Sequence, residues 1–217
     1  MPMLQLEGLG KSFGETRVFH GVTLGVGRGE FVALLGESGV GKSTLLNCVA
    51  GLEQADQGRV RVDGRDLAQL DDNARARLRR AHLGFVFQAF HVLPHLSVAE
   101  NVALPLLLLG RPDAQRVLQV LDAVGLGGLG ARHPAQLSGG QLQRVAIARA
   151  VVHAPGLILA DEPTGNLDPD TAARVLGVLQ AQVQDAGAAC LLVTHSATAA
   201  ARADRVLRLT SSGIVDA

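Results

Sequence analysis

The sequence has 217 residues and a formal net charge of zero, with 20 lysines and arginines against 20 aspartates and glutamates. A chain of this length can bury one sizeable core but is short for two independent domains. Because no net field would draw the chain to nucleic acid or to an anionic membrane, we expect no nucleic-acid partner.

The cysteines and the N-terminus indicate the compartment. Cys48 and Cys190 lie far apart in apolar surroundings, whereas a secreted disulfide framework normally uses more cysteines. Residues 1–11 lack the basic stretch and apolar run of a signal peptide. The apolar run 102–109 contains Pro105 and is far shorter than the roughly 20 residues that span a bilayer. We therefore expect a protein of a reducing compartment that is soluble by itself.

The first third of the chain predicts strands on either side of a loop and a helix. Apolar residues alternate with polar or small ones over 4–7, 22–26 and 59–62, and Asp63-Gly64 follows the last stretch. This pattern is typical of half-buried antiparallel strands and a turn. Residues 31–35 form a continuous apolar run, which leads into a glycine-rich loop and a helical pattern over 43–50 that Gly51 can end.

The middle of the chain predicts helices. Over 71–82 the acidic residues precede the arginines, an order that suits a helix dipole, and a solvated helix face is a simpler interpretation than a nucleic-acid patch. Between 88 and 156 we predict helices over 113–124 and 141–153 and interpret the segment as an inserted helical lobe. The glycines of 125–130 read as G-x-G-x-x-G, but they follow a helix and not a strand, which indicates a helix stop and a loop.

The last third predicts a return to the core. The short apolar runs 157–160 and 189–193 bracket a helical pattern that starts near residue 170 and ends near 185. Parallel strands joined by a helix have this pattern, so we expect an α/β fold.

A phosphate-binding loop lies between the predicted strand 31–35 and the helix that follows. The pattern G-x-x-x-x-G-K-[ST] is matched by Gly36, Glu37, Ser38, Gly39, Val40, Gly41, Lys42 and Ser43, followed by Thr44. The glycines let backbone N–H groups turn toward phosphate oxygens, Lys42 adds a positive charge, and the hydroxyl of Ser43 can bind magnesium. A glycine turn with a chance lysine is the alternative, and both flanking elements argue against it.

Two carboxylates end the apolar run 157–160. Asp161 can hold Mg²⁺ near the phosphate loop, and Glu162, one residue on, is then free to orient and deprotonate an attacking water. An acidic pair at a strand end is common and often only solvated. Its coexistence with the phosphate loop favours the catalytic interpretation.

The signature segment, residues 137–144 with the sequence Leu-Ser-Gly-Gly-Gln-Leu-Gln-Arg, precedes the predicted helix 141–153. Ser138 is an N-cap type, and the glycines leave backbone donors exposed. An ordinary helix start is the alternative, but a second anion-ready helix N-terminus favours a phosphate ligand. The segment resembles the ABC signature L-S-G-G-Q, and it follows a phosphate loop and precedes an Asp-Glu strand in the order found in ABC ATPases.

This resemblance covers almost the whole chain and implies its organisation. It implies a P-loop NTPase (RecA-like) core with an N-terminal antiparallel β subdomain and an inserted α-helical subdomain. The implied boundaries are 1–87 and 157–217 for the core with its β subdomain, and 88–156 for the helical signature subdomain.

The resemblance also implies roles for single residues in binding ATP and Mg²⁺. Phe13 is similar to the aromatic that stacks on adenine, although tyrosine is more usual there. Gln88 resembles the hinge glutamine that reaches Mg²⁺ and the attacking water and that responds to contact with the permease. Asp168 lies in a segment that resembles the loop that contacts the opposite subunit. His195 resembles the switch histidine that contacts the γ-phosphate. The implied Mg²⁺ ligands are Ser43, Gln88 and Asp161, and the implied catalytic residues are Glu162, His195, Gln88 and Lys42.

The resemblance implies a head-to-tail homodimer that encloses two ATP molecules. In such a dimer Ser138, Gly139, Gly140 and Gln141 bind nucleotide held by the other subunit. Leu142 and Ser196 depart from the usual polar residue and aspartate, which puts the tuning of hydrolysis in doubt but removes no catalytic group.

Segments 87–106 and 160–168 resemble the lipoprotein-release and macrolide-exporter branch. The resemblance implies a cytoplasmic protein, peripheral on the inner face of the membrane, that drives an integral membrane permease with a large extracytoplasmic domain. The alternatives are a non-transport ABC ATPase, whose usual coiled-coil, zinc or second-cassette insertions are missing here, and a cassette that transmits force to cell-wall enzymes during division.

Overall fold

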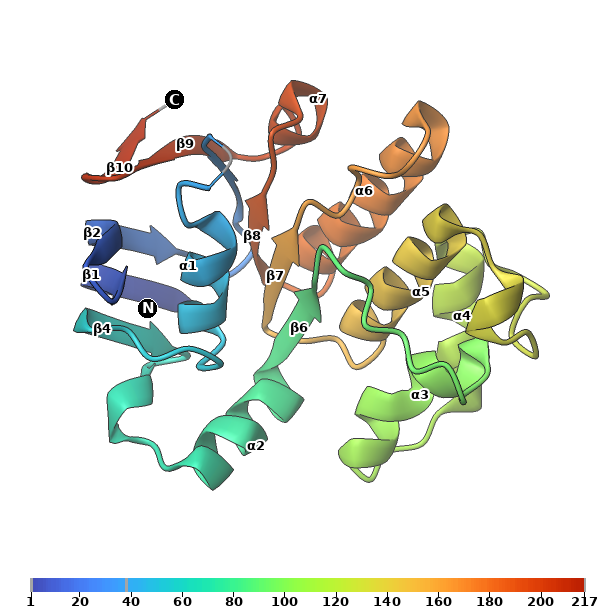
Figure 1. Ribbon diagram of the computed structural model, residues 1–217. Coiled ribbons are helices and arrows are strands. Elements are labelled where there is room, and N and C mark those ends of the chain that lie inside the picture. Colours follow the sequence, from blue (N-terminus) through green and yellow to red (C-terminus); the bar gives the residue numbers. More distant parts are fainter. Residues whose placement is uncertain (1, 38, 217) are drawn as a thin grey trace.

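The computed structural model describes residues 2–37 and 39–216, which form two sheets with helices between and beside them (Figure 1). The smaller sheet is antiparallel and has the order β2-β1-β4-β5. Its strands are β1 Leu4–Phe13, β2 Thr16–Val26, β4 Gln57–Val62 and β5 Arg65–Asp66. The predicted alternation and turn are confirmed, since Asp63 and Gly64 both adopt positive φ values, 50° and 74°, between β4 and β5.

The larger sheet has the order β10-β9-β3-β8-β7-β6 and is parallel apart from the β9–β10 pair. Its strands are β3 Phe31–Leu35, β6 Leu83–Val86, β7 Leu157–Asp161, β8 Ala189–Val193, β9 Arg205–Thr210 and β10 Gly213–Asp216. The predicted strands 31–35, 157–160 and 189–193 are confirmed. The continuous apolar runs arise because β3, β7 and β8 are covered on both faces.

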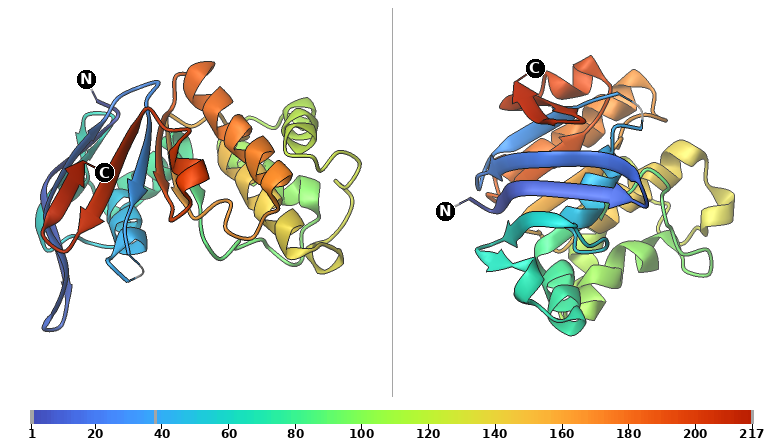
Figure 2. Two further views of the ribbon diagram at one scale, coloured as in Figure 1. Left: turned by 90° about the horizontal axis from the view of Figure 1, so that it is seen from above. Right: turned by 60° about the vertical axis from the view of Figure 1, so that its left-hand side comes forward.

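Two hydrophobic cores show this double burial. Leu157 and Leu159 of β7 pack with the antiparallel sheet and α1 (Lys42–Val49). Ile158 and Ala160 of the same strand pack on the opposite face, with α5 (Gly139–Val151) and α6 (Pro169–Gln184). Figures 1 and 2 show α1 between the two sheets, and α5 and α6 on the far side of the parallel sheet. The phosphate-loop helix is therefore held firmly at the centre of the molecule.

Five helices agree with the predicted ones within about two residues, the usual uncertainty of a helix end. They are α1, α2 Asp72–His82, α4 Ala114–Ala123, α5 Gly139–Val151 and α6 Pro169–Gln184. No helix was predicted at α3 Val98–Leu108 or at the short α7 Ala197–Ala200, and short 3₁₀ turns lie at Leu67–Gln69 and Pro134–Gln136. Helix α5 begins two residues before the predicted start because Ser138 caps it. The predicted stop after α4 is confirmed, since Gly125 has φ 69°.

The α/β fold class is confirmed, with α3, α4 and α5 inserted between β6 and β7. Helix α3 was not predicted as a helix, and it contains Pro105 in its interior. A proline there costs one helical hydrogen bond, which is offset by a complete capping box between Ser97 and Glu100 at the helix start. Within 2–37 and 39–216, no helix is both long and apolar enough to cross a bilayer.

Asn101 ties the loop before α3 to the helix, and it is fully buried. Its Oδ1 accepts the N–H of Leu93 at 2.8 Å, and its Nδ2 donates to the carbonyls of Leu93, Leu96 and Ser97, each at 3.0 Å. Buried backbone groups that lose such partners cost free energy.

We predict that Asn101→Ala lowers the free energy of unfolding by about 2 kcal/mol, because several buried backbone groups would lose their partner. Urea denaturation followed by circular dichroism measures the change. The control is Asn73→Ala, on the exposed face of α2, for which we expect a change below about 0.5 kcal/mol. Equal changes for the two variants would contradict the bracing role of Asn101.

Candidate active site

A cavity of about 600 Å³ lies where the predicted motifs meet. The predicted residues that line it are Phe13, Gly39, Gly41, Lys42, Ser43, Thr44, Gln88, Asp161, Glu162 and His195. They come from the last residues of β1 and β7, from the loops after β3, β6, β7 and β8, and from the first turn of α1. Ligands in open α/β sheets bind at the carboxyl ends of the parallel strands, and this cavity lies at those ends.

The phosphate loop needs its glycines. Gly41 has φ 98°, and a Cβ on it would collide with the side chains of Val18 and Phe19. Lys42 Nζ donates to the carbonyl oxygens of Gly36 and Glu37 at 2.7 and 2.8 Å, so the ammonium is held by the loop itself. The N-terminus of α1 opens into the same cavity, and its free N–H groups favour an anion.

Asp161, the last residue of β7, is 6% exposed. Burial raises the pKa of its carboxyl, and a hydrogen bond with Ser43 opposes that rise. A hydroxyl and a buried carboxylate side by side are hard oxygen ligands that fit Mg²⁺. In the described part of the chain no three His, Cys, Asp or Glu residues cluster for a metal.

Glu162 follows Asp161 in a strained conformation. Its φ is 48°, in the left-handed region that a non-glycine residue rarely adopts. Its N–H donates to the carbonyl of Val193 at 2.9 Å, which ties the strained residue to the end of β8. His195 Nδ1 lies 2.8 Å from Glu162 Oε1. The carboxylate is largely buried and the imidazole is exposed at the cavity.

The residue after this histidine, Ser196, is a departure from the usual aspartate, and the structure gives it a clear task. It is the N-cap of α7, and its Oγ accepts the N–H of Ala199 at 3.2 Å. Serine and aspartate are comparable N-caps. The substitution therefore preserves the start of this helix.

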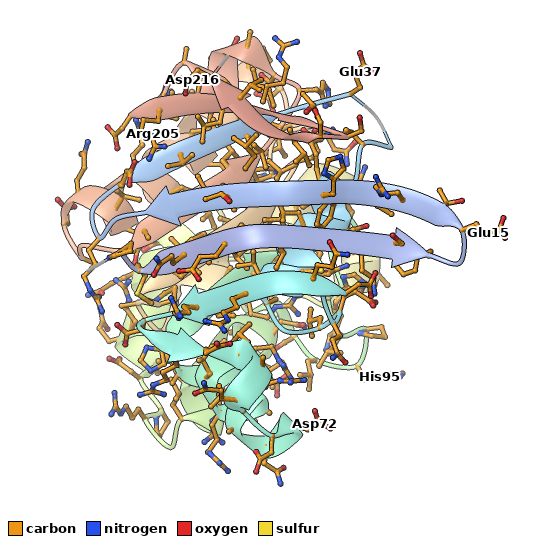
Figure 3. All side chains as sticks on the ribbon, turned by 90° about the vertical axis from the view of Figure 1, so that its left-hand side faces the viewer. Glu15, Glu37, Asp72, His95, Arg205 and Asp216 are labelled. Carbon is orange, nitrogen blue, oxygen red and sulfur yellow. The ribbon has the colours of Figure 1, made fainter. Side chains whose placement is uncertain are left out.

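Phe13 and Gln88 both line the cavity. Phe13 ends β1 with its ring 52% exposed, and Lys11 Nζ lies 4.9 Å from the ring centroid. Figure 3 shows Glu15, in the β1–β2 turn, at the right-hand end of the two strands and Glu37, in the phosphate loop, above it. Gln88 lies two residues beyond β6.

The signature residues lie outside this cavity lining. Ser138 caps α5, its Oγ accepting the N–H of Gln141 at 3.3 Å while its own N–H donates to Gln141 Oε1 at 2.9 Å. Ser138 and Gly139 are exposed, and Gly140 packs near Leu167. The helix start therefore presents its donors to the outside of the chain.

Asp168 is also exposed and outside the lining, where it caps α6. Its Oδ1 accepts the N–H of Thr171 at 3.0 Å. Hydrogen bonds from the side chain and the backbone of Thr171 lower the pKa of this carboxyl. A carboxylate at a helix N-terminus is stabilised in this way, so Asp168 has a structural task whatever else it contacts.

Some predicted residues do not line the cavity, and some lining residues were not predicted. Gly36, Glu37 and Val40 form the loop without lining the cavity, and Ser38 lies outside the described residues. Sequence reasoning did not select three lining residues, Val18, Gly165 and Asn166. The only signal for the last two was their place between Glu162 and Asp168 in the sequence.

The fold and the site define the class: an α/β protein whose phosphate loop, carboxylate pair and histidine share one cavity at the carboxyl ends of parallel strands. Residues 19–165 match the family described as ABC transporter. The chain belongs to the ABC transporter family and is an ATPase of that family.

Two LolD proteins match over nearly their full length, and a MacB protein matches over about a third of its length. The chain is 47% identical to the lipoprotein-releasing system ATP-binding protein LolD of Cereibacter sphaeroides, covering 98% of this chain and 99% of the relative. It is 49% identical to the LolD protein of Anaeromyxobacter dehalogenans, covering 99% and 93%. It is 43% identical to the macrolide export ATP-binding/permease protein MacB of Shigella flexneri, covering 99% of this chain and 34% of that protein. The resemblance to this branch is confirmed.

Solved structures agree with the fold. The ATP-binding cassette MJ0796, in a dimeric post-hydrolysis state bound to ADP and Pi, superposes with a TM-score of 0.92 at 36% identity, covering 99% of this chain and 98% of that one. A second dimeric structure of MJ0796 has the same TM-score at 37% identity, covering 98% and 96%. The predicted P-loop NTPase fold with its β and helical additions is confirmed.

Proposed function

We propose that this chain hydrolyses ATP to drive lipoprotein release or export through a separate membrane permease. The full-length likeness to LolD proteins is the observation that carries this proposal. On this proposal the chain works on the cytoplasmic face of the membrane, bound to a permease with a large extracytoplasmic domain. We propose the helical subdomain 88–156, between the core segments 1–87 and 157–217, as part of the permease contact.

Within this function we propose roles for the cavity residues. Phe13 stacks on the adenine, and the phosphate loop with Lys42 holds the phosphates. Ser43, Gln88 and Asp161 hold Mg²⁺, which neutralises charge on the phosphates when bound. Glu162 accepts a proton from the attacking water, and His195 stabilises charge at the γ-phosphate. The strained, largely buried Glu162 supports its role as base.

A second, apolar groove supports a docking site for the permease. It has a volume of about 300 Å³ and lies between α2, β6, α3 and α5. Leu83, Phe85, Leu104, Pro105 and Leu108 line it, with a basic rim of Arg79, Arg80 and Arg149. Leu108 is exposed, Phe85, Leu104 and Pro105 are half-buried, and Leu83 is buried. A partly exposed apolar surface of this kind is typical of a protein interface. The rim favours a partner segment that carries acidic side chains next to apolar ones.

The groove and the ATP cavity are linked through β6 and the residues that follow it. Strand β6 lines the groove with Leu83 and Phe85, and Gln88 in the cavity is three residues beyond Phe85. Arg149 lines the groove and donates to the carbonyls of Phe90 and His91 at 3.1 and 2.8 Å. A segment bound in the groove would therefore touch the same elements that position Gln88, which gives the two sites a physical route for coupling.

We predict that Leu108→Glu abolishes binding of the permease while the isolated protein keeps its ATPase activity, because Leu108 is 61% exposed and lines the groove. Co-purification with the co-expressed permease in detergent measures the effect. The matched control is Leu118→Glu, 53% exposed on α4 and outside the groove lining. If both variants co-purify with the permease equally well, the groove is not its docking site. Identifying the captured permease also distinguishes transport from force transmission to cell-wall enzymes.

A further inference from the structure

Thr194 is a polar residue buried at the point where three strand ends of the site meet. It directly follows β8, and none of its surface is exposed. Its N–H donates to the carbonyl of Leu34, in β3, at 3.3 Å. Leu34 stands two residues before the phosphate loop. The backbone of Thr194 is therefore fixed relative to that loop.

The hydroxyl of Thr194 has a defined direction. Its Oγ1 accepts the N–H of Ser196 at 3.0 Å and lies 3.1 Å from Glu162 Oε2. A threonine hydroxyl has a single proton to donate, and an ionised carboxylate only accepts. Because the Ser196 N–H already donates to Oγ1, the hydroxyl proton points to Glu162.

Glu162 is thus held by two donors of different mobility. The exposed His195 side chain contacts Oε1 at 2.8 Å, while the fully buried Thr194 contacts Oε2. An exposed ring can leave when the site changes shape, whereas a buried hydroxyl directly after a central strand cannot move far. Thr194 is the part of this network that keeps the orientation of the carboxylate constant.

We propose that Thr194 is a positioning residue for ATP hydrolysis, which fixes the carboxylate of Glu162 relative to the phosphate loop. The inference rests on the proposed role of Glu162 as the base. A general base must lie within hydrogen-bond reach of the water it deprotonates, and small errors in position cost large factors in rate. Thr194 itself touches no substrate.

The test compares two substitutions that separate positioning from packing. Thr194→Val keeps the shape and removes the hydroxyl, and we expect kcat for ATP hydrolysis to fall about 10- to 100-fold with KM for ATP changed less than about threefold. Thr194→Ser keeps the hydroxyl and removes a buried methyl group, and we expect it to retain most of kcat. A role limited to packing predicts the reverse order, because serine leaves a cavity and valine does not.

Controls make each outcome decisive. Thr23→Val removes a hydroxyl that accepts the Gly8 N–H on the exposed face of β2, and its kcat should equal that of the parent. If the valine variant fails to fold in a thermal melt, Thr194→Ala against Thr194→Ser repeats the comparison without added volume. Valine at the parent rate, or serine as slow as valine, overturns the proposal.

Glu162→Gln measured in parallel separates the role of Glu162 as the base from the positioning role of Thr194. If this variant hydrolyses ATP at the parent rate, the assignment of the base is wrong and the role of Thr194 falls with it. If Glu162→Gln is inactive while Thr194→Val is fully active, only the inference about Thr194 is wrong.

Discussion

Glu162→Gln should lower ATP turnover about 100-fold or more while ATP binding is preserved, because glutamine has nearly the same shape but cannot accept the proton. Glu162 lines the cavity beside Asp161 and Lys42, so the substitution leaves the phosphate loop and the Mg²⁺ ligands in place. With hydrolysis blocked, ATP remains bound and the closed dimer should accumulate. Phosphate release measures the first effect, and size-exclusion chromatography with ATP measures the second.

The control for this prediction is Glu100→Gln. Glu100 is exposed at the start of α3, where its Oε2 accepts the N–H and the hydroxyl of Ser97, each at 2.7 Å. Glutamine also serves at this position of a capping box, so the turnover should match that of the parent. Turnover at the parent rate in Glu162→Gln as well would show that another group activates the water.

The site was largely predictable because its chemistry sits where strands end. Lys42, Asp161 and His195 each follow a strongly apolar run, and parallel strands bring their carboxyl ends to one edge. Val18 was not predictable, because it belongs to β2 of the antiparallel sheet and reaches the cavity only by packing near Gly41 of the phosphate loop. Thr194 was visible only as a neighbour of His195, since its hydrogen bond to Glu162 joins residues 32 positions apart.

The elements that escaped prediction have weak local signals. Strand β6 has four residues and includes Gly84, where a Cβ would collide with the carbonyl of Ala150 in α5. The close approach of α5 requires a glycine at this position, whereas a glycine in the sequence argues against a strand. Helix α3 was hidden by Pro105, which normally argues against a helix interior. In β6 a tertiary contact outweighs the local preference, and in α3 the capping box of Ser97 and Glu100 offsets the proline.

The signature segment has an observed geometry that one chain leaves incomplete. Ser138 and Gly139 are exposed at the N-terminus of α5, and Ser138 is absent from the lining of its own chain's ATP cavity. A helix N-terminus favours an anion, and the solved MJ0796 cassettes are dimeric. We propose that each ATP is bound between the phosphate loop of one chain and the signature segment of its partner, which a head-to-tail dimer with twofold symmetry provides.

Ser138→Arg should then abolish turnover while the ATP affinity of the monomer stays within about twofold of the parent value, because a bulky cation at the exposed helix start opposes the dipole and keeps the signature segment from binding the ATP held by its partner. Equilibrium binding at protein concentrations that keep the chain monomeric measures the affinity. If the monomer loses ATP affinity, the signature acts within its own chain and the proposal is wrong.

Mixing two inactive variants tests the same arrangement by complementation. Lys42→Ala damages the phosphate loop, and Ser138→Arg damages the signature segment. A mixed dimer has one site with both defects and one site with neither, because the intact loop of one chain faces the intact signature of the other. If the two sites act independently and the chains pair at random, an equal mixture should recover about a quarter of the parent turnover, since about half the dimers are mixed. Neither variant alone can recover activity, so turnover in the mixture can come only from a site shared between two chains.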